Sequence, residues 1–239
     1  GARVEVHTAS GVKIRDVKSG DGFRYMNSIN THIGLGTETS ISKIVVYWPN
    51  SGCEEFLNPT INQSFVATEG SGSRCDVILS PKVFLQGAAM NPNSGEESLM
   101  RDDLRANGWL ALNATTSPYS DELVADTSVF NTIGADAIVD WVFVELRDKA
   151  DNTQILDSQS AFLQRDGDVV NVDGISPLSF DQANDGFYVA IKHRNHLGIL
   201  SAITYPLSSV NTVVDLATSP SDIEGNGNAV IALSNGLFG

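Results

Sequence analysis

Residues 3–7 read Arg-Val-Glu-Val-His, and residues 12–15 read Val-Lys-Ile-Arg. In both stretches apolar side chains alternate with polar ones, which is the pattern of a β-strand with one buried face. Ser10 and Gly11 lie between the two stretches and favour a tight reversal of the chain. The sequence therefore predicts a β-hairpin here.

A third stretch, residues 44–48, reads Ile-Val-Val-Tyr-Trp and is apolar at every position. Such a strand is expected in the middle of a sheet, where both of its faces are covered. Pro49 removes a backbone donor, and the Asn-Ser-Gly sequence of residues 50–52 favours a second reversal. We expect Phe65 and Ala67 to lie on the strand that closes this small sheet.

The later part of the chain also has the pattern of β-structure. Predicted strands cover residues 138–147, 154–156, 160–164, 168–172, 186–192, 198–204 and 210–216. Asp166 and Gly167 favour a hairpin turn between two of these strands. Because short strands follow one another closely with turns between them, the pattern favours a β-sandwich, Ig-like or prealbumin-like.

One segment has helical features. Ser94 is a suitable N-cap for residues 96–106, Leu99 and Leu104 belong to an apolar stripe, and Gly108 follows its end. The expected fold class is therefore all-β, with a small β-sheet domain, a β-sandwich and one short helix.

Length and charge divide the chain into two parts. Its 239 residues exceed the usual size of one domain, and the Gly- and Ser-rich residues 69–73 suggest a short linker. We expect a β-domain over residues 1–73 and an acidic β-sandwich over residues 74–239. The first 75 residues carry seven basic and seven acidic side chains, whereas the remainder carries eight and 22.

The net charge of −14 bears on possible partners. An acidic surface without clustered Lys or Arg repels phosphate backbones, so the sequence argues against nucleic acids and anionic membranes as partners. Strong acidity is equally typical of proteins selected for solubility. No apolar run approaches the roughly 20 residues that a membrane-spanning helix needs, so we expect no membrane insertion.

Cys53 and Cys75 are the two cysteines of the chain. A disulfide between them would close a loop of about 22 residues and contribute roughly 3 kcal/mol. Two free thiols, or one exposed and one buried, are the alternatives. We expect the disulfide, which an oxidising compartment would permit.

Several landmarks of the first seventy residues occur in a recognisable order. They are Gly1-Ala2-Arg3-Val4, His32-Ile33-Gly34-Leu35-Gly36, the Val-x-Trp-Pro stretch that ends at Gly52, Asn62-Gln63 and Glu69-Gly70. In order and spacing they resemble the ASPIC/UnbV domain of the cartilage acidic protein family, in which that domain follows a β-propeller of FG-GAP repeats. Since the family has no established catalytic residue, the resemblance implies a non-catalytic domain. It also implies that this domain docks on such a propeller.

Parts of the remaining chain, among them residues 100–105, 138–142, 145–148 and 190–198, resemble a region of large secreted bacterial surface proteins. No named activity accompanies that resemblance. It implies an extracellular or cell-surface location, with the signal sequence outside this stretch of chain. We therefore expect a non-catalytic interaction and spacer module, with a protein or a surface glycan as its partner.

Catalytic motifs are absent from the sequence: there is no Gly-x-Ser-x-Gly, no His-Glu-x-x-His and no phosphate-binding Gly-x-x-x-x-Gly-Lys. Asp140 and Glu145 lie five positions apart on one predicted strand, so they should point to opposite faces and not act as a carboxylate pair. His193 and His196 should also point to opposite sides unless the chain bends, so we do not expect a metal site there. We expect no enzyme and no cofactor.

Two weaker possibilities concern ligands. Calcium prefers several oxygen ligands, and Asp166, Asp168 and Asp173 are candidates for supplying them, although β-turns use the same residue types. The alternative function is a carbohydrate-binding module, in which aromatic rings stack on sugars. Candidates for this role are Trp109, Tyr119 and Tyr205.

Overall fold

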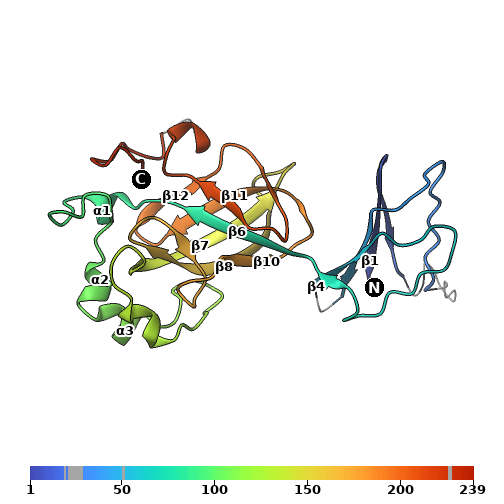
Figure 1. The fold of residues 1–239 in the computed structure, drawn as a ribbon, viewed down its shortest axis with the longest axis horizontal. Coiled ribbons are helices and arrows are strands. Elements are labelled where there is room, and N and C mark those ends of the chain that lie inside the picture. Colours follow the sequence, from blue (N-terminus) through green and yellow to red (C-terminus); the bar gives the residue numbers. More distant parts are fainter. Residues whose placement is uncertain (19, 21–28, 50–51, 226–227) are drawn as a thin grey trace. The chain divides into compact units, whose positions relative to one another are not determined.

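The computed structural model describes residues 1–18, 20, 29–49, 52–225 and 228–239. The chain forms two compact units (Figure 1). The N-terminal unit consists of Gly1–Val77 together with Asp181–Asn184, and the C-terminal unit of Ile78–Phe180 together with Asp185–Gly239. Both units are built mainly from strands, which confirms the all-β fold class.

The N-terminal unit contains one antiparallel sheet with the strand order β2-β1-β3-β4-β5. Its strands are β1 (Arg3–Thr8), β2 (Gly11–Asp16), β3 (Lys43–Trp48), β4 (Gly52–Leu57) and β5 (Ser73–Arg74). The predicted hairpin is confirmed as β1 and β2, and β3 lies between β1 and β4, as its two apolar faces require. The predicted turn residues 50 and 51 lie outside the described part of the chain.

The prediction that Phe65 and Ala67 lie on a closing strand is wrong. Both residues lie in a loop, and β4 and β5 complete the sheet instead. The Phe65 ring packs edge to face on Phe56 with the ring centroids 5.2 Å apart, and Ala67 packs against the buried cluster beneath the sheet. Their apolar character therefore reflects loop packing and not strand pairing.

The expected linker at residues 69–73 is instead bonded into the N-terminal unit. The backbone N–H groups of Gly70 and Gly72 donate to the two carboxylate oxygens of Glu54. Burial works against the charged form of Glu54, but these two bonds, together with smaller contributions from the Trp48 side chain and the Ser71 backbone, prevail and lower its pKa. Ser73 is the first residue of β5, so the chain is bonded to the sheet up to the disulfide cysteine Cys75.

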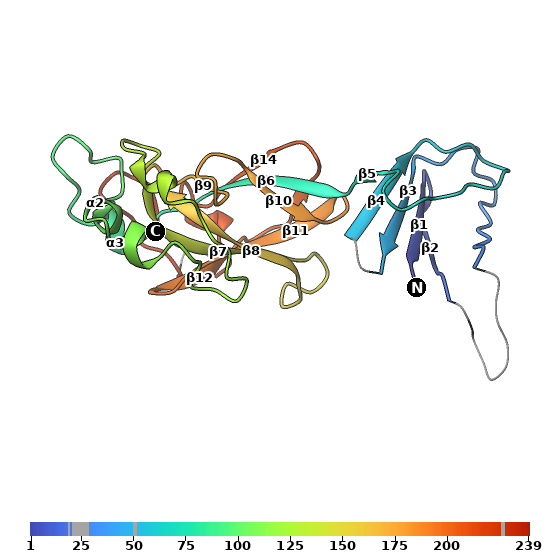
Figure 2. The ribbon, with the colours of Figure 1, turned by 90° about the horizontal axis from the view of Figure 1, so that it is seen from below.

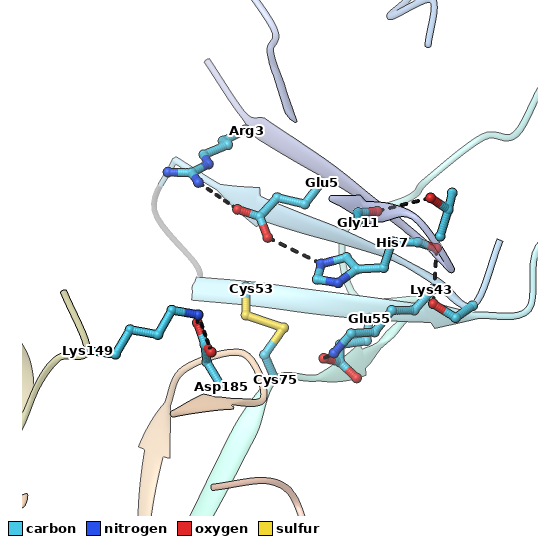
Figure 3. Close-up of polar contacts among 12 residues, drawn as sticks. Arg3, Glu5, His7, Gly11, Lys43, Cys53, Glu55, Cys75, Lys149 and Asp185 are labelled. Atoms are coloured by element: carbon cyan, nitrogen blue, oxygen red, sulfur yellow. Dashed lines mark hydrogen bonds and ion pairs between the residues drawn. A yellow bond between two sulfur atoms is a disulfide. The ribbon is translucent and has the colours of Figure 1, made fainter. Parts of the chain in front are cut away.

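The two faces of this sheet are covered differently. One face buries Val6, Ile44 and Val46 beneath loop side chains. The other carries a smaller cluster around the Cys53–Cys75 disulfide, together with ion pairs (Figure 3). The ion pairs of this face are Arg3 with Glu5 at 2.6 Å, His7 with Glu5 at 3.3 Å, and Lys43 with Glu55 at 2.5 Å.

The C-terminal unit packs one sheet, β12-β11-β7-β8-β9 with β13 paired to β11, against a second sheet, β10-β6-β14 (Figure 2). The strands are β6 (Asp76–Lys82), β7 (Ile138–Asp148), β8 (Ile155–Gln164), β9 (Val169–Val170), β10 (Leu178–Asp181), β11 (Asp185–His193), β12 (His196–Leu200), β13 (Tyr205–Leu207) and β14 (Thr212–Asp215). The arrangement is a β-sandwich, in which the β6–β14 pair is parallel.

The core of this unit is built around β7. Trp141 is fully buried on that strand, and its ring packs on Phe162 of β8 with the centroids 4.1 Å apart. Its indole N–H donates to the backbone oxygen of Ala114 at 2.8 Å, so the polar group of this large side chain is satisfied. Phe130 and Leu110 complete the same cluster.

Two strand predictions need correction. Residues 154–156 and 160–164, expected as separate strands, form the single strand β8, because residues 157–159 continue the antiparallel pairing with β7. Of the segment 198–204, expected as one strand, only residues 198–200 are in a strand, β12, and residues 201–204 lie between β12 and β13. The hairpin turn at Asp166 and Gly167 is confirmed.

The helix predicted over residues 96–106 is confirmed only at its C-terminal end, and it is not the one helix of the fold. The structure has α1 (Gln86–Ala89), α2 (Asp103–Ala106) and α3 (Trp109–Asn113), and the short 3-10 segments Thr127–Asn131 and Pro220–Asp222. Glu96 and Met100 do not continue a helix, because the Glu96 carboxylate pairs with Arg165 and the Met100 N–H donates to the Arg165 backbone oxygen. Tertiary contacts therefore override the local helical pattern.

Candidate functional site

A cavity of about 100 Å³ lies in the C-terminal unit. Its lining combines apolar side chains, among them Phe84, Leu85 and Leu216, with the imidazoles of His193 and His196. An apolar recess with a few polar groups is the usual form of a small-molecule site. This cavity is therefore the candidate site, and its chemistry depends on what the two imidazoles can do.

The two histidines face each other across a hairpin. His193 ends β11, His196 begins β12, and they are paired in the antiparallel register beside a register shift. The two Nδ1 atoms are 2.9 Å apart. The two side chains therefore do not point to opposite sides, because the chain reverses within the two residues between them, which is the exception that the prediction allowed.

Each histidine has a further partner on its other ring nitrogen. His193 Nε2 lies 3.2 Å from Asp140 Oδ2, and Arg194 donates to the same oxygen at 2.7 Å. The backbone N–H of Gly87, in α1, donates to His196 Nε2 at 3.2 Å. Four elements of the fold thus meet at this cluster, which we call the histidine cluster: Asp140, His193, Arg194, His196 and the Gly87 N–H.

Asp140 and Glu145 lie on opposite faces of β7, as their spacing predicts. Both carboxylates are buried and both are paired with neighbouring residues of β11. Glu145 binds Arg147 and Lys192, whereas Asp140 binds His193 and Arg194. Since they do not converge on one space, the two carboxylates cannot flank a common glycosidic bond.

Tyr119, a candidate for sugar stacking, has both its ring and its hydroxyl in contact with other residues of the fold. Its ring stacks on Phe143 with the centroids 5.1 Å apart, and its hydroxyl lies 3.3 Å from the backbone oxygen of Lys192. Burial, followed by the negative charge of Asp140, raises the pKa of Tyr119 to about 12. The phenol is therefore neutral, and its hydroxyl donates a hydrogen bond that attaches the loop of Tyr119 to strand β11.

Tyr205 and Trp109 occupy separate places. Tyr205 lies on β13 and pairs with Phe187 of β11. Tyr119 instead contacts Lys192, which is five residues further along β11. At the rise of a β-strand, these two points on β11 are roughly 16 Å apart. Trp109 lies on α3 with 44% of its surface exposed. Tyr119 and Tyr205 therefore do not form one stacking platform, and Trp109 is the most open of the three aromatic candidates.

The three aspartates that were candidates for calcium each have partners within the C-terminal unit. Asp166 accepts from the Asp168 N–H, and Asp168 pairs with Lys82 at 3.2 Å. Asp173 accepts from the backbone N–H groups of residues 175 and 176 and from the Ser176 hydroxyl. Among the described residues, no group of three or more His, Cys, Asp or Glu side chains is arranged to hold a metal ion.

The predicted disulfide is present. Cys53 on β4 and Cys75, just after β5, are bonded, with their Cα atoms 5.5 Å apart. Both are buried beside Val45, and the Cys53 N–H donates to Asp181. The bond therefore sits in the N-terminal unit as a structural link between strand β4 and the end of its sheet.

Comparison with known proteins bears on the N-terminal unit. Residues 1–74 match the family model described as ASPIC and UnbV, which confirms the resemblance that the sequence shows. Domains of this family are associated with FG-GAP-containing surface proteins. The chain thus joins a unit similar to the domains of this family to a β-sandwich.

The comparisons add nothing for the remaining residues. No curated protein and no solved structure matches the chain. In the part of the chain that the structure describes, no helix is long and apolar enough to cross a membrane.

Proposed function

We propose that this chain is a non-catalytic interaction and spacer module of a secreted or cell-surface bacterial protein. It would follow an FG-GAP β-propeller, on which the N-terminal unit docks, while the acidic C-terminal unit presents its loops to a protein or glycan partner. The match of residues 1–74 to the ASPIC and UnbV family is the observation that carries this proposal.

The arrangement of ionisable groups supports a role without catalysis. At the cavity, the histidines and Asp140 are bonded to one another and to Arg194, so each has a structural partner. Glu145 is bound by two basic side chains on the opposite face of β7. A general acid or base would instead need a polar atom free to reach substrate.

Binding to a recombinant FG-GAP β-propeller, measured by biolayer interferometry, tests the proposal. The intact chain should bind, and Val66→Asp should weaken binding about tenfold or more, because Val66 is 80% exposed on the N-terminal unit. Leu112→Asp is the matched control, since Leu112 is 83% exposed on the C-terminal unit. No binding of the intact chain, or equal loss in both variants, would overturn docking through the N-terminal unit.

Carbohydrate binding is the second candidate function, and the exposure of Trp109 is the observation in its favour. A glycan array with the intact chain and with Trp109→Ala separates the two proposals. Selective binding that the substitution abolishes would favour a sugar site on α3. Binding that survives in Trp109→Ala would exclude this tryptophan as the stacking platform.

A further inference from the structure

The protons of the histidine cluster can be assigned from its donors. A backbone N–H can only donate, so the Gly87 N–H requires His196 Nε2 to be an unprotonated acceptor. His196 then carries its proton on Nδ1 and donates it to His193 Nδ1 at 2.9 Å. The Asn195 N–H also points at His193 Nδ1, at 3.2 Å, which agrees with an acceptor at that atom.

The remaining bond completes the assignment. Since His193 Nδ1 is an acceptor, the His193 proton lies on Nε2 and is donated to Asp140 Oδ2. The hydrogen bonds therefore run in one direction, from Gly87 through His196 and His193 to Asp140. This sequence of bonds exists only when both imidazoles are neutral and in opposite tautomers.

Protonation of either ring breaks a specific bond. A proton on His196 Nε2 would face the Gly87 N–H, donor against donor, and so would release α1 from the hairpin. A proton on His193 Nδ1 would face the donors of His196 and Asn195. We propose that the His193–His196 pair is a pH-operated latch, which fastens α1 to the β11–β12 hairpin at neutral pH and releases it on acidification.

The charged groups around the His193–His196 pair include some that favour protonation of the imidazoles and some that oppose it. Asp140 attracts a proton, but Arg194 already neutralises the same carboxylate oxygen. Lys192 is held by Glu145. On the side of α1, Arg101 donates to the Gly87 backbone oxygen at 3.3 Å and pairs with Asp103 at 3.1 Å. Burial and the neighbouring His193 together outweigh Asp140 and lower the pKa of His196.

Release would be local. α1 and its N-cap Leu85 keep three attachments that do not depend on the imidazoles. The Arg101 backbone N–H donates to the Ala88 oxygen at 2.8 Å, the Arg101 side chain donates to the Gly87 oxygen at 3.3 Å, and the Leu85 N–H points at the Met100 sulfur at 3.2 Å. Leu85 and Gln86 line the cavity beside the histidines. Loss of the Gly87 bond would therefore widen the cavity at this edge and leave the sandwich intact.

The first test is the tautomeric state of the intact protein by long-range ¹H–¹⁵N NMR of the histidine rings at about pH 7.5. We expect His196 as the Nδ1–H tautomer and His193 as the Nε2–H tautomer. The same tautomer on both rings, or a charged ring at this pH, would overturn the proposal. This measurement needs no variant and so does not depend on how a substitution folds.

The second test is hydrogen exchange of residues 86–89 at about pH 7.5 and, because the pKa of His196 is lowered, at about pH 4.5, corrected for the intrinsic exchange rate. Protection of α1 should fall about tenfold on acidification. His196→Ala should show weak protection at both values, while His32→Ala, an exposed histidine of the N-terminal unit, should behave as the unaltered protein. Protection of α1 that does not change with pH in the unaltered protein would overturn the latch.

Discussion

The two units of this protein achieve stability by different means. The N-terminal unit divides its apolar side chains between two small clusters, one on each face of its sheet, and adds a disulfide and ion pairs. The C-terminal unit has a strand, β7, whose residues are almost all buried, and its aromatic rings pack on one another. It contains no cysteine.

This difference follows from size. A sheet of about 80 residues buries a smaller fraction of its surface than a domain of about 160 residues, so its core alone gives a marginal free energy of unfolding. A covalent link that restricts the unfolded chain is therefore most useful in the smaller unit. The comparison predicts that aromatic substitutions matter most in one unit and cysteine substitutions in the other.

The largest expected effect is that of Trp141→Ala. Removing this fully buried side chain should lower the free energy of unfolding of the C-terminal unit by about 3–5 kcal/mol. Urea denaturation followed by circular dichroism measures the change. Trp109→Ala, at an exposed tryptophan of the same unit, is the control and should change the value by no more than about 0.5 kcal/mol. Similar losses in both variants would contradict a core centred on β7.

Replacing both cysteines, Cys53→Ala with Cys75→Ala, should destabilise the N-terminal unit by about 3 kcal/mol, because the bond closes a loop of 22 residues. Thermal unfolding by differential scanning calorimetry, with probes in each unit, measures the effect. The transition of the cysteine-free C-terminal unit should stay where it is. If that transition shifts as much as the other, the proposed division of roles is wrong.

Arg165→Met tests whether the larger unit also depends on a polar link. Arg165 is buried and donates to the Met100 backbone oxygen and to Glu96, so its loss should cost about 2 kcal/mol near pH 7. The hydrogen bond from Arg165 holds the pKa of Glu96 at about 2.

The stabilising effect of the Arg165–Glu96 pair should depend on pH in a definite direction. A lowered carboxylate pKa contributes stability that is complete above the unfolded value of about 4.5 and is lost as the pH falls toward about 2. The difference between the unaltered protein and Arg165→Met should therefore shrink over that range in acid denaturation curves. A difference that stays constant down to pH 2 would show that Glu96 takes no part in it.

The smallest expected effect concerns a segment far along the chain. Asp181 belongs to the N-terminal unit and accepts the Cys53 N–H, so Asp181→Ala should lower the stability of that unit by about 1 kcal/mol. Asp185→Ala is the matched control, because Asp185 forms an exposed ion pair with Lys149 in the C-terminal unit. Equal, negligible shifts in thermal unfolding would show that this late segment does not support the N-terminal unit.

Sequence patterns predicted the strands that depend on local alternation. β1, β2, β3 and β7 each carry enough regularly spaced apolar residues to be placed from the sequence alone. β8 was predicted as two strands, because the polar residues 157–159 interrupt its pattern and only their pairing with β7 makes the strand continuous. Of the helix expected at residues 96–106 only Asp103–Ala106 forms, because Glu96 pairs instead with Arg165, which lies 69 positions away in the chain.

The histidine cluster illustrates the same limit. The two residues between the histidines, Arg194 and Asn195, lack the Asn-Gly or Asp-Gly signal of a tight hairpin, so a reversal there was not predicted. Asp140 and Gly87 approach the pair from elements more than 50 positions away in the chain. The disulfide, by contrast, was predicted because two cysteines allow one pairing within the chain.

The inclusion of Asp181–Asn184 in the N-terminal unit has a consequence for synthesis. Residues 1–77 leave the ribosome before the C-terminal unit, but about a hundred further residues must be translated before the segment that contacts Cys53 exists. At about 5–20 residues per second, this delay lasts roughly 5–20 s. The N-terminal unit can therefore reach its final form only after most of the following domain has been translated. The time at which it completes its folding thus depends on synthesis of the C-terminal unit.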